Sequence, residues 1–245
     1  MKLRWEIIIL ICIGLWSCKV NHLSSIQSQT TNVSDLEEDV AVQKLVAPYK
    51  AALDKEMDEV IGRLGTKLEK ARPEGSLGNW LADVLVDQAS IYLDEKVDLG
   101  VMNSGGIRIG SLEQGEVKRR KIFELMPFEN GLTVLYLKGN DLIDFIQFMA
   151  YKGGWPVSRG LQYKLDVGKA EQIQLNDQSI QADQVYSVAI TDYIANGGDG
   201  SGLKIIERKE TGKSIREAIF DYFADRKNEE IFYENRIRIK KRNNE

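Results

Sequence analysis

Three short segments combine glycine, polar and aromatic residues in a pattern that could bind a small ligand. They are Asn103-Ser104-Gly105-Gly106-Ile107-Arg108, Pro127-Phe128, and Ala195-Asn196-Gly197-Gly198-Asp199-Gly200, with Tyr193 just before the last. Both glycine-rich segments follow apolar runs that predict strands, and loops that follow strands are frequent ligand sites. Glycine by itself is weak evidence, because every tight turn favours it. The argument for a site therefore rests on the side chains that accompany the glycines.

Each of these side chains suits a different part of a ligand. Phe128 and Tyr193 offer flat faces for stacking, although aromatic rings are also common core residues. An ionised Asp199 can accept two hydrogen bonds and the Asn103 amide can donate and accept, although both residue types also occur as simple turn residues. The planar guanidinium of Arg108 suits bidentate recognition of oxygen atoms, and its alternative is a surface arginine without a partner.

Composition excludes several other kinds of site. The net charge of -4 gives no basic excess, so a nucleic-acid partner is not expected. The only histidine is His22 and the only cysteines are Cys12 and Cys18, so the later part of the chain has no residues for a histidine-rich metal centre or a thiol nucleophile. We therefore expect no catalytic residue and no metal ligand here. A carboxylate-only Mg²⁺ or Ca²⁺ site stays open, although no spacing indicates one.

The N-terminus has the pattern of a bacterial lipoprotein signal. Lys2 and Arg4 precede an apolar run from Ile7 to Trp16, which has the length of a signal-peptide core and is too short to span a membrane comfortably. The run ends in Leu15-Trp16-Ser17-Cys18, which is similar to a lipobox. Residues 1–18 are therefore predicted to be a removable signal, with lipidation at Cys18 and anchoring in the bacterial envelope, facing the periplasm or the exterior. The alternative is an uncleaved N-terminal anchor.

The remainder is expected to contain a tether, a helix and one domain. Residues 19–35 are polar and predict a flexible tether. Apolar residues at three- and four-residue steps predict an amphipathic helix over 36–62, ended by Gly62 and Gly65. Residues 63–240 form the predicted domain, in which Ser76 is the expected N-cap of a second helix. The basic run Lys118–Lys121 is interpreted as a solvated face.

The predicted domain is α+β, with a mixed β-sheet flanked by helices. Apolar runs and turn signals predict strands at 63–69, 97–102, 132–137, 161–165, 172–175 and 185–191, and a last strand after Asn235. Helical periodicity predicts helices at 140–150 and 213–226.

In order and spacing the three segments, together with Leu77-Gly78-Asn79, resemble the C-terminal domain of the 5'-nucleotidase and UDP-sugar hydrolase family. The resemblance runs from about Val40 to Arg226. It implies that this domain holds a nucleotide for a separate N-terminal metallophosphatase domain. It places the base between two aromatic rings and the sugar and phosphate against polar side chains. The residues that it assigns to the substrate are Asn103, Arg108, Phe128, Tyr193, Gly198, Asp199 and, one position out of register, Arg72.

The same resemblance implies that the chemistry needs a partner. In the family, divalent metals in the metallophosphatase domain activate water, so cofactors are expected only in a separate polypeptide. The leading hypothesis is the nucleotide- or nucleoside-binding half of a split periplasmic 5'-nucleotidase, with the helix from Val40 as a docking element. The alternatives are a non-catalytic nucleotide-capture lipoprotein and a domain kept for protein contacts. Nucleoside monophosphates, UDP-sugars and cyclic nucleotides all remain open as ligands.

Overall fold

The computed structural model describes residues 39–225 and 236–240. The expectations for the signal, the tether and Cys18 lie outside these residues. The chain divides into two compact units, Met1–Pro48 and Tyr49–Glu245, and all elements described below except the first half of helix α2 belong to the second. No helix among the described residues combines the length and apolar character needed to cross a membrane.

Helix α2 (Val40–Met57) is shorter than the predicted helix over 36–62. Its C-terminal limit was wrong because Val60–Leu64 forms strand β1, which pairs antiparallel with β5 (Gly115–Lys118). The β-branched residues Val60 and Ile61 favour this extended structure. The basic run 118–121 is ion-paired on this face, for example Arg120 with Asp54 at 2.9 Å and Arg119 with Glu59 at 2.6 Å. The side chains of Lys118, Arg120 and Lys121 are 41–55% exposed, in agreement with a solvated face, whereas Arg119 is 23% exposed and lies over Phe220.

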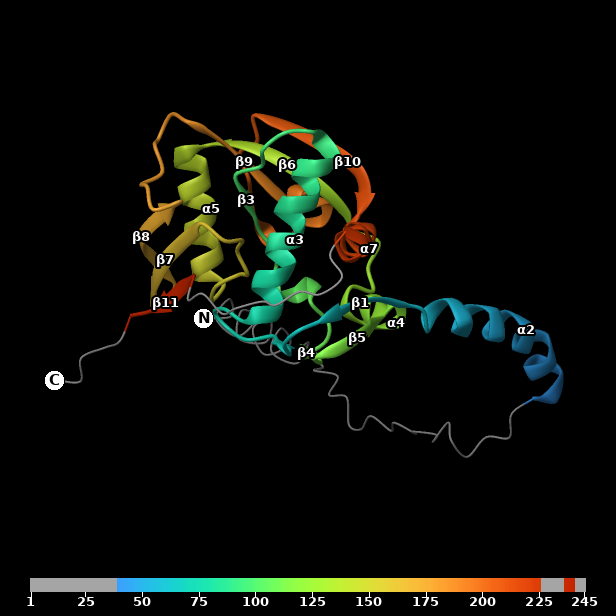
Figure 1. Ribbon diagram of the computed structural model, residues 1–245. Coiled ribbons are helices and arrows are strands. Elements are labelled where there is room, and N and C mark those ends of the chain that lie inside the picture. The colour runs from blue at the N-terminus through green and yellow to red at the C-terminus, as the bar shows by residue number, and fades with distance from the viewer. Residues whose placement is uncertain (1–38, 226–235, 241–245) are drawn as a thin grey trace, which may run out of the picture. The chain divides into compact units, whose positions relative to one another are not determined.

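The central sheet has four strands in the order β10-β6-β9-β3. They are β10 (Glu207–Ser214), β6 (Gly131–Lys138), β9 (Val185–Thr191) and β3 (Leu99–Gly100). Strand β6 runs antiparallel to β9 and β10, whereas β3 runs parallel to β9 (Figure 1). The predicted mixed sheet is thus confirmed. Strand β3 is shorter than predicted.

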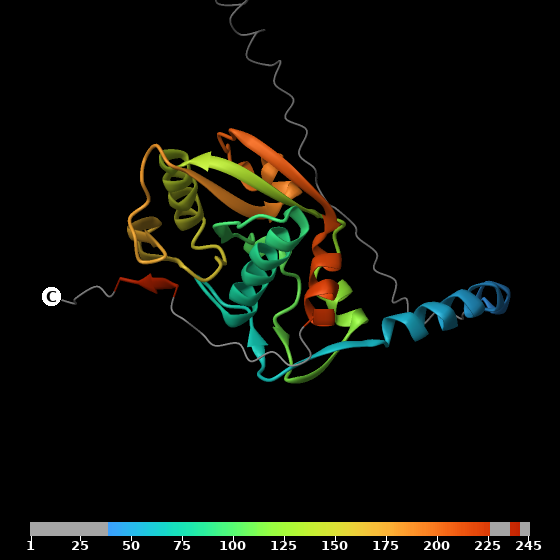
Figure 2. The same ribbon diagram turned by 45° about the horizontal axis from the view of Figure 1, so that its top comes forward.

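Apolar side chains alternate between the two faces of this sheet and give the domain two core clusters. On β6, Leu132 and Val134 join a cluster with α3 (Ser76–Leu93) and α7 (Ile215–Asp225). Leu135 and Leu137 of the same strand join a second cluster with α5 (Gly139–Tyr151). Figure 2 shows α3 and α7 side by side beneath the sheet. Helices therefore cover both faces, as a period-two strand pattern requires.

Two smaller sheets and several short elements complete the domain. A three-stranded sheet has the order β11-β7-β8. Its strands are β11 (Ile237–Ile239), β7 (Leu161–Asp166) and β8 (Lys169–Leu175). A two-stranded sheet joins β2 (Leu68–Glu69) to β4 (Ser111–Leu112). The short helical elements are η2 (Ser104–Gly106), α4 (Arg119–Leu125), α6 (Asp192–Ala195) and η3 (Gly198–Gly200).

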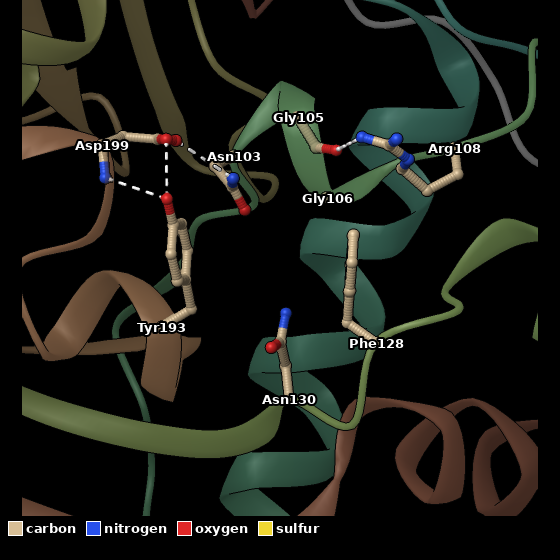
Figure 3. Close-up of a pocket in the computed structure, with 8 residues that line it drawn as sticks. All are labelled: Asn103, Gly105, Gly106, Arg108, Phe128, Asn130, Tyr193 and Asp199. Carbon is tan, nitrogen blue, oxygen red and sulfur yellow. Dashed lines mark hydrogen bonds between the residues drawn. The ribbon is translucent and has the colours of Figure 1, made fainter.

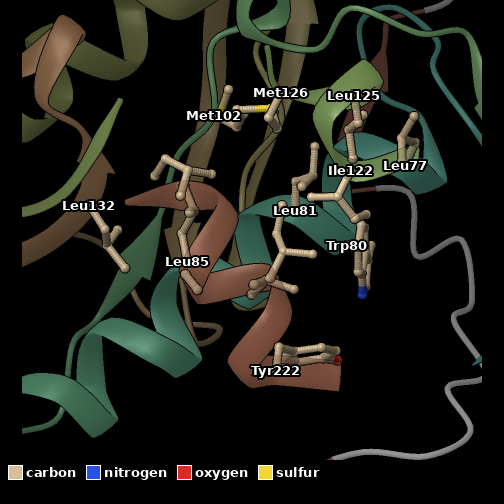
Figure 4. Close-up of a cluster of buried hydrophobic side chains, with 14 of the residues drawn as sticks. Leu77, Trp80, Leu81, Leu85, Met102, Ile122, Leu125, Met126, Leu132 and Tyr222 are labelled. Atoms are coloured by element: carbon tan, nitrogen blue, oxygen red, sulfur yellow. The ribbon is translucent and has the colours of Figure 1, made fainter. Parts of the chain in front are cut away.

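Helix α3 carries Trp80, the largest side chain of the first core cluster (Figure 4). The Trp80 ring lies 6.1 Å from Tyr222 and 5.5 Å from Phe223 of α7, measured between ring centroids. The prediction of Ser76 as its N-cap was wrong, because the cap residue is Gly75. The Ser76 hydroxyl instead accepts a hydrogen bond from the backbone N–H of Glu69 at 2.9 Å, so it joins the helix to β2.

A buried charge network fixes the C-terminal strand β11 to α3. Arg236 is 2% exposed and its guanidinium donates to both carboxylate oxygens of Asp83, at 3.0 and 2.8 Å. Its Nη1 also donates to the carbonyl oxygen of Val157 at 2.8 Å. The buried Glu74 carboxylate accepts the backbone N–H groups of Arg236 and Ile237 at 2.9 and 2.6 Å. Strand β11 is therefore part of the fold.

This network predicts a large effect for Arg236→Met, which keeps the apolar stem and removes the charge. The buried Asp83 carboxylate loses its main partner, so the free energy of unfolding falls by about 3 kcal/mol. Urea unfolding measures the loss. Arg238→Met is the matched control on the same strand, because Arg238 makes an exposed bond to Gln162, and it changes stability by less than about 0.5 kcal/mol. Equal effects of the two substitutions would contradict the interpretation.

Candidate ligand-binding pocket

Strand register brings the three sequence motifs together at one edge of the central sheet. Strands β3 and β9 are parallel, so the segments that follow them, with Asn103 and Tyr193, leave the sheet at the same edge. Strand β6 is antiparallel to β9, and Leu132 near its start pairs with Thr191 at the end of β9. The segment before β6, which carries Phe128, therefore reaches the same edge.

The three motifs line one hollow of about 310 Å³, a size within the range of small-ligand sites, roughly 300–1,000 Å³. Its lining residues are Asn103, Gly105, Gly106, Arg108, Phe128, Asn130, Tyr193 and Asp199 (Figure 3). Five of the seven predicted site residues are among them. The other two, Gly198 and Arg72, lie outside this lining.

The two predicted stacking rings face the hollow from opposite sides (Figure 3). Phe128 is 48% exposed and Tyr193 is 45% exposed, so the alternative that they are core side chains is wrong for both. The Asn130 side chain points into the space between them from below. Two exposed rings across a gap offer apolar faces to a flat group, and the amide offers a donor and an acceptor at its edge.

Hydrogen bonds hold the Asp199 carboxylate to the side chains of Asn103 and Tyr193. Asn103 Nδ2 donates to Asp199 Oδ2 at 3.1 Å, and the Tyr193 hydroxyl donates to Asp199 Oδ1 at 3.1 Å. The Asp199 backbone N–H donates back to the Tyr193 hydroxyl oxygen at 3.3 Å. Asp199 has φ 56° and ψ 7°, a left-handed conformation that is uncommon for a residue with a side chain.

Gly198 has a steric role behind the Tyr193 ring. A Cβ atom at this position would lie 2.6 Å from Cε1 of Tyr193 and 2.5 Å from its carbonyl oxygen. Any larger residue would push the ring or the loop. Gly198 thus supports the pocket without lining it.

Three cations, Arg108, Lys70 and Arg72, lie close enough for their charges to interact, and of these Arg108 lines the hollow. Arg108 Nη1 donates to the Gly105 carbonyl oxygen at 3.3 Å, and the guanidinium carbon lies 5.4 Å from the centre of the Phe128 ring. Lys70 Nζ donates to the Ile107 carbonyl oxygen at 2.7 Å. Burial lowers the pKa of the Lys70 ammonium, and the charges of Arg72 and Arg108 lower it further. Arg72 itself donates to the Lys152 carbonyl oxygen at 3.2 Å.

The segment that carries Phe128 is held from behind by Arg216 at the start of α7. Its buried guanidinium donates from Nη1 to the carbonyl oxygens of Met126, at 3.0 Å, and Phe128, at 2.6 Å, and it also contacts the Glu129 carboxylate. The backbone N–H of Ile215 donates to the Asn130 carbonyl oxygen at 2.9 Å. Helix α7 therefore fixes the backbone on which one ring of the pocket stands.

Sequence analysis missed two residues of this arrangement. Asn130 follows Phe128 by two positions and lies two positions before the predicted strand 132–137, so its polar type in that position could have marked it. Arg216 lies inside the predicted helix 213–226, where it gave no signal because helix surfaces commonly carry arginine. No group of three or more His, Cys, Asp or Glu residues that could hold a metal ion occurs in the described part of the chain.

The site is an aromatic-walled hollow at the edge of a mixed sheet, and comparison with known proteins gives the family of the domain. The sequence profile described as "5'-nucleotidase, C-terminal domain" matches residues 57–207. The chain belongs to this family.

Relatives and solved structures agree with this assignment. A 5'-nucleotidase of Vibrio vulnificus is 28% identical over 68% of this chain and 31% of that protein, and protein UshA of Escherichia coli is 24% identical over 68% and 30%. The crystal structure of a 5'-nucleotidase precursor from Thermus thermophilus has a TM-score of 0.70 and 26% identity, covering 82% of this chain and 43% of that one. The chain thus spans about a third of the length of these curated relatives.

The contacts of Arg216 predict that Arg216→Lys loosens the Phe128 segment. A lysine keeps the charge, but its single nitrogen cannot replace both Nη1, which donates to two carbonyl oxygens, and Nη2, which contacts the Glu129 carboxylate. The loss of one charge-assisted hydrogen bond corresponds to about tenfold faster backbone hydrogen exchange between Met126 and Asn130. Hydrogen–deuterium exchange with mass spectrometry measures this rate. Arg119→Lys is the control, because Arg119 lies over Phe220 and pairs with Glu59; a similar acceleration in both variants would refute the role.

Proposed function

We propose that the domain binds a nucleotide or nucleoside, with the base between Phe128 and Tyr193 and the ribose against Asp199. The observation that carries the proposal is the pair of half-exposed rings across a hollow, beside a carboxylate held by two hydrogen bonds. Base–aromatic stacking contributes about 1–3 kcal/mol per base. Membership of the 5'-nucleotidase C-terminal domain family supports the same ligand class.

The other lining residues fit the remaining parts of such a ligand. The Asn130 amide points between the rings, where the polar edge of a base would lie. Arg108, with Lys70 and Arg72 close enough to influence one another, forms a cationic side suited to a phosphate. Asn103 and Gly105 form the wall next to Asp199.

Hydrolysis is proposed to require a separate metallophosphatase polypeptide. In this proposal the domain is the binding half of a split 5'-nucleotidase-type hydrolase. It matches about a third of the length of its curated 5'-nucleotidase relatives. The metals that activate water would belong to the partner. Apolar side chains exposed on α2, including Leu45, Tyr49 and Leu53, suit a docking element. Lipidation at Cys18 would hold the pair at the bacterial envelope.

The binding proposal predicts saturable titration of the full-length protein in detergent with AMP, adenosine or UDP-glucose. Phe128→Ala removes one stacking face, so the affinity falls about 10- to 100-fold. Isothermal titration calorimetry measures both proteins. Tyr151→Ala is the matched control, because Tyr151 is an aromatic residue that is 77% exposed and does not line the hollow. Absence of binding up to millimolar concentrations of all three ligands would overturn the proposal.

The split-enzyme proposal predicts that phosphate release from AMP appears only in a mixture. The chain alone is inactive, and activity arises when a metallophosphatase polypeptide of the source bacterium and a divalent cation are added. Replacing Leu45 and Leu53 of α2 by Asp lowers this activity and leaves AMP binding unchanged. If AMP binds but no such polypeptide restores hydrolysis, the chain is instead a nucleotide-capture protein.

A further inference from the structure

The hydroxyl group of Tyr193 makes contacts that base stacking does not need. Phe128 forms the opposite wall of the hollow without a hydroxyl, so an aromatic ring is enough for a stacking surface. The Tyr193 hydroxyl nevertheless makes two hydrogen bonds, one to the Asp199 carboxylate and one from the Asp199 backbone N–H, at 3.1 and 3.3 Å. These bonds connect the stacking wall directly to the acidic group of the pocket.

We propose that the Tyr193 hydroxyl is a positioning group that sets the Asp199 carboxylate for the vicinal hydroxyls of ribose. Discrimination between ribose and 2'-deoxyribose then depends on this phenol. The inference rests on the proposed function, since it names the part of the nucleotide that this side of the pocket selects.

The hydrogen-bonding capacity of the carboxylate supports the proposal. An ionised carboxylate has about four lone-pair sites on its two oxygens. Tyr193 occupies one site on Oδ1 and Asn103 occupies one site on Oδ2. One acceptor site remains on each oxygen, and Asp199 is exposed in the lining of the hollow. A carboxylate held at both oxygens can therefore accept one bond from each of two neighbouring hydroxyl groups.

The local backbone makes this position reproducible. Asp199 and Tyr193 are linked by two hydrogen bonds in opposite directions, which close a ring between side chain and main chain. Gly198 lies against the Tyr193 ring with no space for a Cβ atom. The Tyr193 ring and the Asp199 carboxylate are therefore held at a fixed separation. A ligand whose base stacks on the ring presents its ribose to the carboxylate at a correspondingly fixed distance.

Loss of the hydroxyl would release the carboxylate but not the ring. In Tyr193→Phe the stacking face is unchanged, while Oδ1 of Asp199 loses its anchor and the side chain gains freedom. A ligand that uses Asp199 must then order it on binding, which corresponds to a loss of about five- to tenfold in affinity. A ligand that cannot bind both carboxylate oxygens of Asp199 loses less affinity.

The test compares AMP with 2'-deoxy-AMP on the full-length protein, which keeps base and phosphate constant. The wild-type protein is expected to prefer AMP, since a site built to bind a hydroxyl rejects the analogue that lacks it. Tyr193→Phe is expected to weaken AMP binding about five- to tenfold and 2'-deoxy-AMP binding less than about twofold. Asp199→Ala removes the preference, and adding Tyr193→Phe to Asp199→Ala then changes neither affinity further. Calorimetry gives all affinities, with Tyr151→Phe as the control tyrosine.

The outcomes separate this inference from the proposed function. Equal weakening of both ligands by Tyr193→Phe means that the hydroxyl only supports the loop, and unchanged affinities mean that it has no role; either result overturns the inference while nucleotide binding stands. If the wild-type protein binds neither ligand, the proposed function fails and the inference fails with it.

Discussion

The pairing of β6 with β9 is the constraint on which the pocket depends. Because Leu132 pairs with Thr191, the segment entering β6 and the segment leaving β9 meet at one edge of the sheet. Parallel pairing of β3 with β9 brings a third segment to that edge. A slip of one residue in either pairing would reverse which side chains face each core, so burial on both faces of the sheet fixes the register. The position of the pocket follows from core packing.

The exposed rings are a local cost that surrounding contacts offset. Burying a phenylalanine contributes about 1.5–3 kcal/mol, and Phe128 forgoes part of this because half of it remains exposed. Its backbone is held by Arg216, whose buried charge is satisfied by two carbonyl oxygens and the Glu129 carboxylate. Tyr193 is held by Gly198 and Asp199. An open stacking site can therefore be kept rigid without its ligand.

Buried arginines perform similar work in two distant places. Arg216 joins α7 to the pocket segment, and Arg236 joins β11 to α3, each through carbonyl oxygens together with a carboxylate. A guanidinium suits this task because its five donors lie in one plane and reach several acceptors at once. In the curated relatives this domain matches about a third of the protein. The interactions within the domain account for its core, for strand β11 and for its pocket.

The sequence by itself determined much of the fold and most of the pocket. Periodicity predicted β6, β7, β9 and α5 close to their limits, and five lining residues were expected from their motifs. Sequence patterns mispredicted local structure where contacts between distant residues determine it. Helix α2 ends at Met57 because β1 pairs with β5. The Ser76 hydroxyl accepts a hydrogen bond from Glu69 instead of capping α3. Only the tertiary structure showed Asn130 between the rings, Arg216 behind Phe128 and the Tyr193–Asp199 bond. These contacts join residues whose types have ordinary uses elsewhere, and spatial proximity alone gives them a role.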